Sequence, residues 1–329
     1  MKKNWFIGID ISKKTLDVVI YDQVNKKPGK HFKVLNETKG FKELLRFLKK
    51  EGIKFAETFI CLEYCGIYGL EIGFFFEGKI DFTFCAPLQI KRSLGMTRGK
   101  NDKLDAAKIA RYCYMFREEL KASSMPTQTM IKLKSLMSER NRVTKGLKTE
   151  KIVLKELSKQ LDKKSLKRTQ SRLKMFTADI TTIEKEITEL ILKDNKLSKN
   201  YILLLSITGI GMVNAVMMIL CTNNFEGINN ARSFACYCGV APFEYSSGSS
   251  IRGKTKVSNL ANKRMKADLT NAARSALIYD PEIKIYYKRK RAEGKAHGTV
   301  MNAIKFKIIT RAFAVINRQT PFVKLRQAG

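Results

Sequence analysis

Hydrophobic and polar positions in the first 50 residues predict three strands and a helix. Apolar, β-rich residues dominate Trp5–Ile11 and residues 16–21, and a third, more polar run covers residues 30–35. Residues 38–50 then carry apolar side chains at helical spacing, with Thr38 as the expected N-cap. We therefore expect three antiparallel strands followed by a helix.

The pattern then alternates between strand and helix. Residues 58–62 and 82–86 are apolar runs of strand length, and Pro87 ends the second. Residues 67–76, between them, have helical spacing. Three antiparallel strands, a helix and a strand–helix–strand unit follow one another in this order in the ribonuclease-H-like α/β fold. We predict that fold for a first domain, residues 1–125.

The middle of the chain, residues 126–197, predicts two long helices. Apolar residues recur three or four positions apart from Leu133 to Leu161 and again from Leu173 to Leu190. A basic stretch at residues 163–168 is the expected break between them. This spacing is typical of a coiled-coil seam. Two interpretations remain open, an oligomerising arm and an ordinary helical hairpin.

Residues 198–329 are predicted to form a mostly α-helical third domain, so the fold class is α/β plus α. A Gly-Ile-Gly turn interrupts the helical pattern of residues 203–220, and the serine- and glycine-rich stretch 239–256 is expected to be a loop. Another segment begins at Asp280-Pro281. The other helices expected here cover residues 229–237, 259–277 and 300–316.

Charge narrows the choice of partners. The chain has 63 lysines and arginines against 30 acidic residues, a formal net charge of +33, and the excess is spread along its whole length. Such a surface binds polyanions, of which nucleic acid is the first candidate. The chain has only two histidines, His31 and His297, which argues against histidine catalysis and histidine-rich zinc sites.

Cysteine usage and hydropathy predict a cytoplasmic protein. The seven cysteines form no CxxC pair, so we expect reduced thiols, and we interpret Cys236 and Cys238 as structural rather than metal-binding. No signal peptide is expected, because Asp10 interrupts the first apolar stretch. Residues 201–222 are uncharged, but their Gly-Ile-Gly break favours a hairpin over a membrane helix. No membrane association is expected.

Four carboxylates are candidates for a metal site. Asp10 lies near the end of the first strand and Glu63 follows a second apolar strand, and the predicted fold places these strands side by side. Asp102 and Asp105 open a helix three residues apart, on one helical face, although acids in a first turn also favour the helix dipole. Converging carboxylates suit Mg²⁺, and paired ions of this kind can stabilise both oxygens of a phosphodiester exchange.

Two further stretches are candidates for contact with nucleic acid. The serine-rich stretch contains Ser246, Ser247, Ser249 and Ser250 and is followed by Arg252, Lys254 and Lys256, cations that can bind the phosphate that a serine attacks. A flexible linker is the alternative interpretation. The turn at Gly209 and Gly211 resembles a helix-hairpin-helix, whose glycine amides face a phosphate, although the same turn also occurs in plain helical hairpins.

Taken together, the sequence resembles the DEDD transposases of the IS110 family of insertion sequences. The resemblance spans nearly the whole chain and rests on six pieces in order: Phe-Ile-Gly-Ile-Asp, Cys-Leu-Glu-Tyr-Cys-Gly-Ile-Tyr, Asn-Asp-Lys-Leu-Asp-Ala, Ile-Thr-Gly-Ile-Gly, Cys-Gly-Val-Ala-Pro and Tyr-Ser-Ser-Gly-Ser-Ser-Ile-Arg-Gly. It implies a RuvC-like first domain whose four acids are Asp10, Glu63, Asp102 and Asp105. It also implies a C-terminal transposase domain whose nucleophile is Ser247, the serine before glycine, rather than Ser246.

The resemblance further implies how such a protein works. In these enzymes the two domains, contributed by different subunits, share a composite site, and the serine forms a covalent link to DNA. The expected partners are donor DNA, target DNA, a structured bridge RNA and further copies of the chain in a tetramer. Two other functions fit the residues alone: a metal-dependent nuclease or Holliday-junction resolvase that only hydrolyses, and a non-enzymatic protein that packages nucleic acid.

Overall fold

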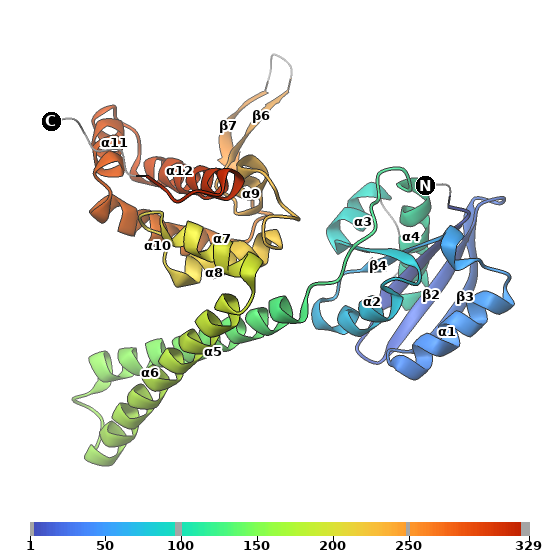
Figure 1. Cartoon of the computed structure of the whole chain (residues 1–329), viewed down its shortest axis with the longest axis horizontal. Coiled ribbons are helices and arrows are strands. Elements are labelled where there is room, and N and C mark those ends of the chain that lie inside the picture. The colour runs from blue at the N-terminus through green and yellow to red at the C-terminus, as the bar shows by residue number, and fades with distance from the viewer. Residues whose placement is uncertain (1–2, 96–100, 248–250, 324–329) are drawn as a thin grey trace. The chain divides into compact units, whose positions relative to one another are not determined.

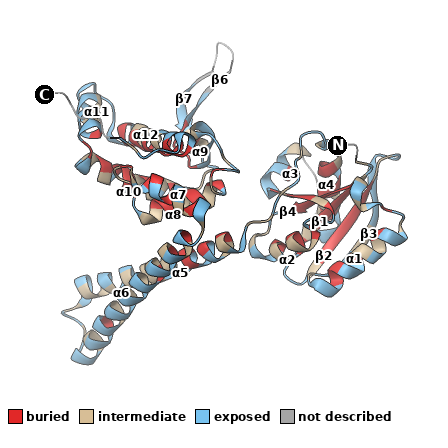
Figure 2. Cartoon of the chain, in the orientation of Figure 1, coloured by how far each residue is buried: buried red, intermediate tan, exposed pale blue. Residues whose placement is uncertain are grey.

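The computed structural model describes residues 3–95, 101–247 and 251–323 (Figure 1). The chain divides into two compact units, residues 1–125 and residues 126–329. Each unit has hydrophobic clusters of its own, visible as the buried residues of Figure 2. In the described residues, no helix is long and apolar enough to cross a membrane, and the seven cysteines are free thiols.

A five-stranded mixed sheet forms the centre of the first unit. Its strands lie in the order β3-β2-β1-β4-β5; β2 pairs antiparallel with β1 and β3, and β4 pairs parallel with β1 and β5. This is the strand order of the ribonuclease-H-like fold, as the hydrophobic pattern predicted. The strands are β1 (Trp5–Ile11), β2 (Thr15–Asp22), β3 (Lys27–Leu35), β4 (Thr58–Glu63) and β5 (Asp81–Cys85).

Helices cover both faces of this sheet, because alternate residues of each strand point to opposite sides. Ile7 and Ile9 of β1 pack with residues of α1 (Thr38–Lys50) and α2 (Leu70–Phe76), whereas Phe6 packs with residues of α4 (Asp102–Met115) on the other face. Thr38 is the first residue of α1, and Glu37, not Thr38, occupies the N-cap position. The remaining helices are α3 (Pro87–Ser93) and two short 3₁₀ turns, η1 (Phe55–Glu57) and η2 (Gly66–Gly69).

The second unit begins with a long helical hairpin. Helices α5 (Gln128–Leu157) and α6 (Lys163–Leu192) lie side by side (Figure 1), and the Arg172 guanidinium donates to the Glu150 carboxylate across the pair at 2.8 Å. Residues 138–182, its outer part, contain one buried residue, Thr169. Figure 2 shows this outer part almost entirely as exposed or intermediate. The pairing within one chain corresponds to the hairpin interpretation; an additional role in oligomerisation stays a prediction.

The break between these helices lies earlier than predicted. We expected it at residues 163–168, but the structure places it before Lys163, where α6 begins. The Asp162 side chain accepts hydrogen bonds from the backbone amides of Lys164 and Ser165, at 2.8 and 2.9 Å. Lysine and arginine are good helix formers, so a basic run does not end a helix, whereas an aspartate N-cap does begin one.

Six further helices follow the hairpin in the described part of the second unit. The base of the hairpin shares their core: Leu133 and Ile187 belong to the same buried cluster as Leu204 and Ile304. The Arg311 guanidinium, in the last helix, lies 2.6 Å from the buried Asp280 carboxylate, which caps another helix. These helices are α7 (Asn195–Leu205), α8 (Met212–Thr222), α9 (Ala231–Tyr237), α10 (Lys263–Tyr279), α11 (Pro281–Ala292) and α12 (His297–Arg318).

The stretch predicted to be a loop contains a β-hairpin instead. Strands β6 (Pro242–Ser247) and β7 (Ile251–Val257) pair antiparallel, with an irregularity between residues 243 and 245. Aromatic and β-branched residues alternate with polar ones on both sides of a serine- and glycine-rich centre, which is a hairpin pattern. The serine content of the stretch had obscured this alternation.

Candidate active site

Asp10 and Glu63 stand at the same end of two neighbouring parallel strands. Ile9 pairs with Leu62 in the β1–β4 register, so Asp10 and Glu63, the next residue of each strand, are neighbours. Gly8 pairs with Cys61, two residues earlier, and both lie on the face covered by α4. Because side chains alternate along a strand, Asp10 and Glu63 share that face.

Helix α4 brings the other two carboxylates to this end of the sheet. The Asn101 side chain caps the helix by accepting from the Leu104 amide at 2.7 Å, and Asp102 and Asp105 occupy its first turn. The helix runs opposite to β1: Tyr114 packs on Phe6, whereas the first turn lies toward Asp10. The first turn of α4 therefore lies at the same end of the sheet as Asp10 and Glu63, and a shared metal site at this end stays a prediction.

Gly8 explains how α4 approaches the sheet so closely. A Cβ atom at this position would lie 2.1 Å from the Ala110 nitrogen and 2.5 Å from the Ala106 carbonyl oxygen, both backbone atoms of α4. A side chain of any size would therefore push the helix away from β1. The glycine two residues before Asp10 sets the distance between Asp10 and the acids of α4.

The electrostatics of Asp10 show that burial and the other three carboxylates act on it. Burial raises the pKa of Asp10 to about 6, and the negative charges of Glu63, Asp102 and Asp105 contribute to this rise in that order, followed by a smaller contribution from Asp17. Each of these acids disfavours the ionised form of Asp10. A cation among them would relieve this repulsion, and oxygen donors are the ligands that hard divalent cations prefer.

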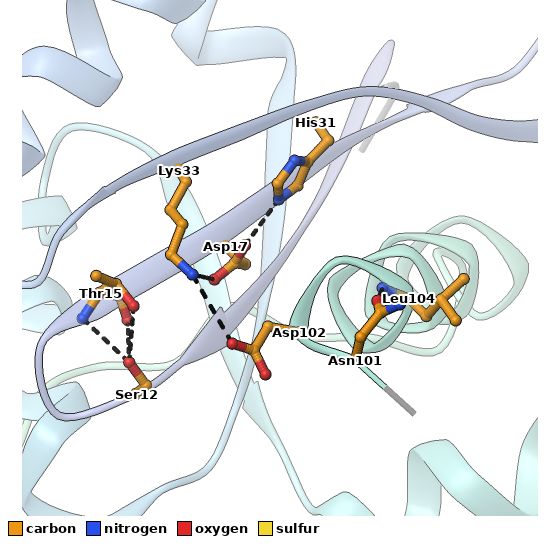
Figure 3. Close-up of polar contacts among 8 residues, drawn as sticks. All are labelled: Ser12, Thr15, Asp17, His31, Lys33, Asn101, Asp102 and Leu104. Atoms are coloured by element: carbon orange, nitrogen blue, oxygen red, sulfur yellow. Dashed lines mark hydrogen bonds and ion pairs between the residues drawn. The ribbon is translucent and has the colours of Figure 1, made fainter. Parts of the chain in front are cut away.

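The α4 carboxylates have lysine partners in this structure. The Lys108 ammonium lies 2.7 Å from an Asp105 oxygen, and Lys33 Nζ lies 3.8 Å from Asp102 Oδ2 (Figure 3). Among the described residues, no three histidine, cysteine or acidic side chains are grouped closely enough to hold a metal ion. The chemistry of the four carboxylates fits a divalent metal. The side chains of Asp102 and Asp105 must leave their lysine partners before all four acids can bind the same ion.

A second group beside these acids was missed by the sequence analysis. Asp17 of β2 pairs with Asp10 in the antiparallel register, and its carboxylate is almost fully buried. His31 Nε2 lies 2.8 Å from one of its oxygens and Lys33 Nζ lies 3.1 Å from the other (Figure 3). The available signal was an acid inside the apolar strand 16–21. Both oxygens of Asp17 have partners, so Asp17 holds Lys33 at the edge of the carboxylate group.

We expect Asp17→Asn to lower the stability of the first unit. The substitution removes two charge-assisted hydrogen bonds from a buried site, which costs about 1–3 kcal/mol. Urea unfolding followed by the fluorescence of Trp5, the one tryptophan of the chain and a residue of β1, would measure the loss. The control is Asp22→Asn at the far end of β2, where the side chain bonds Asn25 at the surface. Equal stability of both variants would contradict this role for Asp17.

The candidate nucleic-acid contacts lie in the second unit. Ser247 is the last residue of β6 and pairs with Ile251, whereas Ser246 pairs with Arg252; Arg252, Lys254 and Lys256 all lie on β7. Ser249 and Ser250 fall outside the described residues. The hairpin therefore carries both the candidate nucleophile and the cations that follow it.

The two glycines of the α7–α8 turn differ in their surroundings. Gly209 has a left-handed φ of +97°, and a Cβ there would lie 2.5 Å from the Ala272 carbonyl oxygen of α10, so folding alone requires glycine. Gly211 is the N-cap residue of α8, and a Cβ atom added to it would meet nothing within 4 Å. Open space at a helix N-terminus suits close approach of a phosphate.

Comparison with known sequences places both units in one group of enzymes. Residues 7–163 match a DEDD transposase family of IS110 elements, described as "Transposase", and residues 201–288 match "Transposase IS116/IS110/IS902 family". The chain is 26% identical over 324 residues to the "Pilin gene-inverting protein" of Moraxella bovis, which covers 97% of this chain and 98% of that protein. The protein of the same name from Moraxella lacunata matches at the same identity and coverage.

Two other similarities cover parts of the chain. The "Insertion element IS110 uncharacterized 43.6 kDa protein" of Streptomyces coelicolor is 29% identical over 126 residues, 38% of this chain and 31% of that protein. The structure of T. thermophilus RuvC in complex with a Holliday junction substrate matches 36% of this chain and 96% of RuvC, at 12% identity and a TM-score of 0.28. The two family matches occur in order along the chain, and a DEDD enzyme implies a divalent metal cofactor. The chain belongs to the IS110 family of DNA transposases.

Proposed function

We propose that this transposase cuts and rejoins DNA with Ser247 as the nucleophile and with Mg²⁺ bound by Asp10, Glu63, Asp102 and Asp105. The observation that supports the proposal is that Glu63 and the first turn of α4 lie at the same end of the sheet as Asp10, where burial and then the charges of Glu63, Asp102 and Asp105 raise the pKa of Asp10. Mg²⁺ supplies positive charge where the oxygens of the exchanged phosphodiester become negative.

The residues of the chain have separate roles in this proposal. Asp10 and Glu63 are held by the sheet and provide fixed ligands, while Asp102, 65% exposed at its side chain, is free to turn from Lys33 toward the ion. The nearby lysines keep the acidic group from repelling DNA before the metal binds. Arg252, Lys254 and Lys256 on β7, together with Gly211, would bind DNA phosphates.

A serine attack on DNA forms a bond between its oxygen and phosphorus and releases a deoxyribose hydroxyl. Ser247 is the last residue of β6, one strand of a two-stranded hairpin whose other strand carries Arg252, Lys254 and Lys256. With no histidine in this hairpin, cations and metal must favour the ionised serine. Ser247 rather than Ser246 is proposed on the family resemblance.

We further propose that a structured bridge RNA of the element selects the donor and target DNA, and that the chain acts as a tetramer. The net charge of +33 on 329 residues favours association with polyanions such as RNA and DNA. The information for the target would then lie in the RNA.

The test is a recombination assay with purified protein, donor and target DNA, the non-coding RNA encoded beside the gene, and Mg²⁺. Ser247→Ala should abolish the covalent protein–DNA adduct on denaturing gels and lower recombination at least about 10³-fold, whereas Ser246→Ala, the matched control, should retain both. A nuclease that only hydrolyses would keep cutting after Ser247→Ala. Equal recombination without the RNA would contradict guidance, and equal activity in EDTA would contradict the metal.

A further inference from the structure

A pocket of about 600 Å³ lies in the second unit, at the base of the β6–β7 hairpin. Its walls come from the start of α9, the segment that leads into β6, the end of β7 and one face of α12. This volume is within the range of pockets that hold small organic ligands. The side chains that carry the argument are Arg232, Lys256, Asn259, Thr299, Asn302 and Phe306.

The charge of the pocket has one sign. Among the residues that the structure describes, its lining contains Arg232 and Lys256 and no carboxylate. Within the described part of the chain, neither of these side chains takes part in a salt bridge, although acids elsewhere in the unit pair with Arg140, Arg172 and Arg311. Both Lys256 and Arg232 are exposed, so both are available to an anion that enters the pocket.

The floor of the pocket, formed by residues 299, 302, 303 and 306 of α12, offers aromatic and polar uncharged groups instead of cations. Residues 299, 302, 303 and 306 are spaced to share one face of α12, and this face lines the pocket. Phe306 is half-buried and contributes an aromatic ring, and Asn302 is half-buried beside it. An aromatic ring next to a carboxamide is the combination that stacks on a nucleobase and hydrogen-bonds its edge.

Lys305 fixes the orientation of Asn302. The Lys305 ammonium, which is buried, donates to Asn302 Oδ1 at 3.2 Å. With its oxygen engaged, the carboxamide has its NH₂ group left for a ligand. Lys266 and Arg274 lie near enough to lower the pKa of Lys305, after the larger effect of burial, so the positive charge extends behind the floor.

We propose that this pocket binds one unpaired nucleotide, with its phosphate on Arg232 and Lys256 and its base on Phe306 and Asn302. The backbone of a duplex would need only the exposed cations and would leave the floor unused, whereas an uncharged apolar ligand would not need the cations. An unpaired nucleotide uses both. Strand exchange produces unpaired DNA and a structured RNA contains unpaired bases, so either can supply it.

The first test measures, by fluorescence anisotropy in EDTA, how tightly the full chain binds single-stranded DNA and duplex DNA with the same number of phosphates. Phe306→Leu keeps an apolar side chain but removes the aromatic face, and should weaken binding of a ten-nucleotide single strand about tenfold while changing duplex binding less than about twofold. Arg232→Gln should weaken single-strand binding and reduce its salt dependence by about one phosphate contact. Phe322→Leu and Lys284→Gln, which do not line the pocket, should leave the single-strand preference unchanged.

The second test needs no variant. A single strand with one 5-iodo-2′-deoxyuridine, and the same sequence as RNA with 5-iodouridine, would be photocrosslinked to the wild-type chain and mapped by mass spectrometry. A crosslink to Phe306 or Asn302 with either strand supports the proposal and identifies DNA or RNA as the source. Crosslinks only outside the pocket, or an unchanged single-strand preference in correctly folded Phe306→Leu, would overturn it. Neither test depends on Ser247 or on the carboxylates, so this proposal and the proposed function can fail separately.

Discussion

Asp10→Asn is expected to abolish recombination and, in the absence of metal, to make the first unit more stable. Loss of a metal ligand at the reacting phosphate should lower the rate about 10³-fold or more. The stability effect has the opposite sign because burial, Glu63, Asp102 and Asp105 raise the pKa of Asp10 to about 6. The folded state therefore disfavours the charge that aspartate carries at neutral pH, and asparagine carries none.

The pH dependence follows from the direction of this pKa shift. Between pH 4 and pH 6 the folded chain holds the Asp10 proton more tightly than the unfolded chain does, so the Asp10 contribution to stability falls as pH rises and is fully unfavourable above about pH 6. The gain from Asp10→Asn should be on the order of 1 kcal/mol at pH 8, since solvent screens a partly exposed carboxylate, and should vanish near pH 4.

Urea unfolding followed by Trp5 fluorescence in EDTA at pH 4, 6 and 8 would measure this difference. Divalent metal should then stabilise the wild type and not the variant. Asp22→Asn, on the same sheet and far from the four acids in the register, is the control and should keep the wild-type response to metal. Since hydrogen bonds to Asn25 lower the pKa of Asp22, this variant should lose rather than gain stability at pH 8. If Asp10→Asn is less stable than the wild type at pH 8, the Asp10 carboxylate has a stabilising partner in the fold. This result would argue against a metal site in which the acids repel one another.

The sheet was predictable because four of its five strands (β1, β2, β4 and β5) are apolar runs whose alternate residues enter two different cores. Ile7 and Ile9 contact one layer of helices and Phe6 the other, and this double burial leaves a pattern in the sequence. The convergence of Asp10 and Glu63 then followed from strand order alone, because parallel neighbours end at the same edge.

Asp17, the β6–β7 hairpin and the start of α6 were not predicted, because they depend on strand register or on competing local signals. Asp17 resembles any acid on a strand until the antiparallel register places it opposite Asp10. The β6–β7 hairpin was predicted as a loop because serine and glycine dominate its centre. The break before Lys163 was placed too late because the basic run was interpreted as the break, although Asp162 is the N-cap of α6. The pocket at α12 combines residues from four segments, and no single stretch of sequence contains it.

Gly8→Ala is expected to affect stability and activity together, in contrast to Asp10→Asn. The added methyl group would meet the backbone of α4 at Ala110 and Ala106, atoms that cannot turn away as a side chain can. Overpacking of this kind costs about 1–3 kcal/mol or more. If α4 moves to make room, Asp102 and Asp105 move away from Asp10 and Glu63, and we expect recombination to fall at least about 10²-fold.

Gly73→Ala is the matched control for this substitution. Gly73 lies in α2 of the same unit. Its added methyl group would meet the end of the Met125 side chain, which is flexible and can move, and would lie 3.2 Å from Phe84 Cζ, with no backbone atom of another described element as close. Urea unfolding followed by Trp5 fluorescence should show a large loss for Gly8→Ala and little change for Gly73→Ala. A Gly8→Ala variant that is destabilised but recombines at the wild-type rate would contradict this prediction. The spacing between β1 and α4 would then not set the geometry of the four carboxylates. The assignment of Asp102 and Asp105 to the metal site would lose its structural basis.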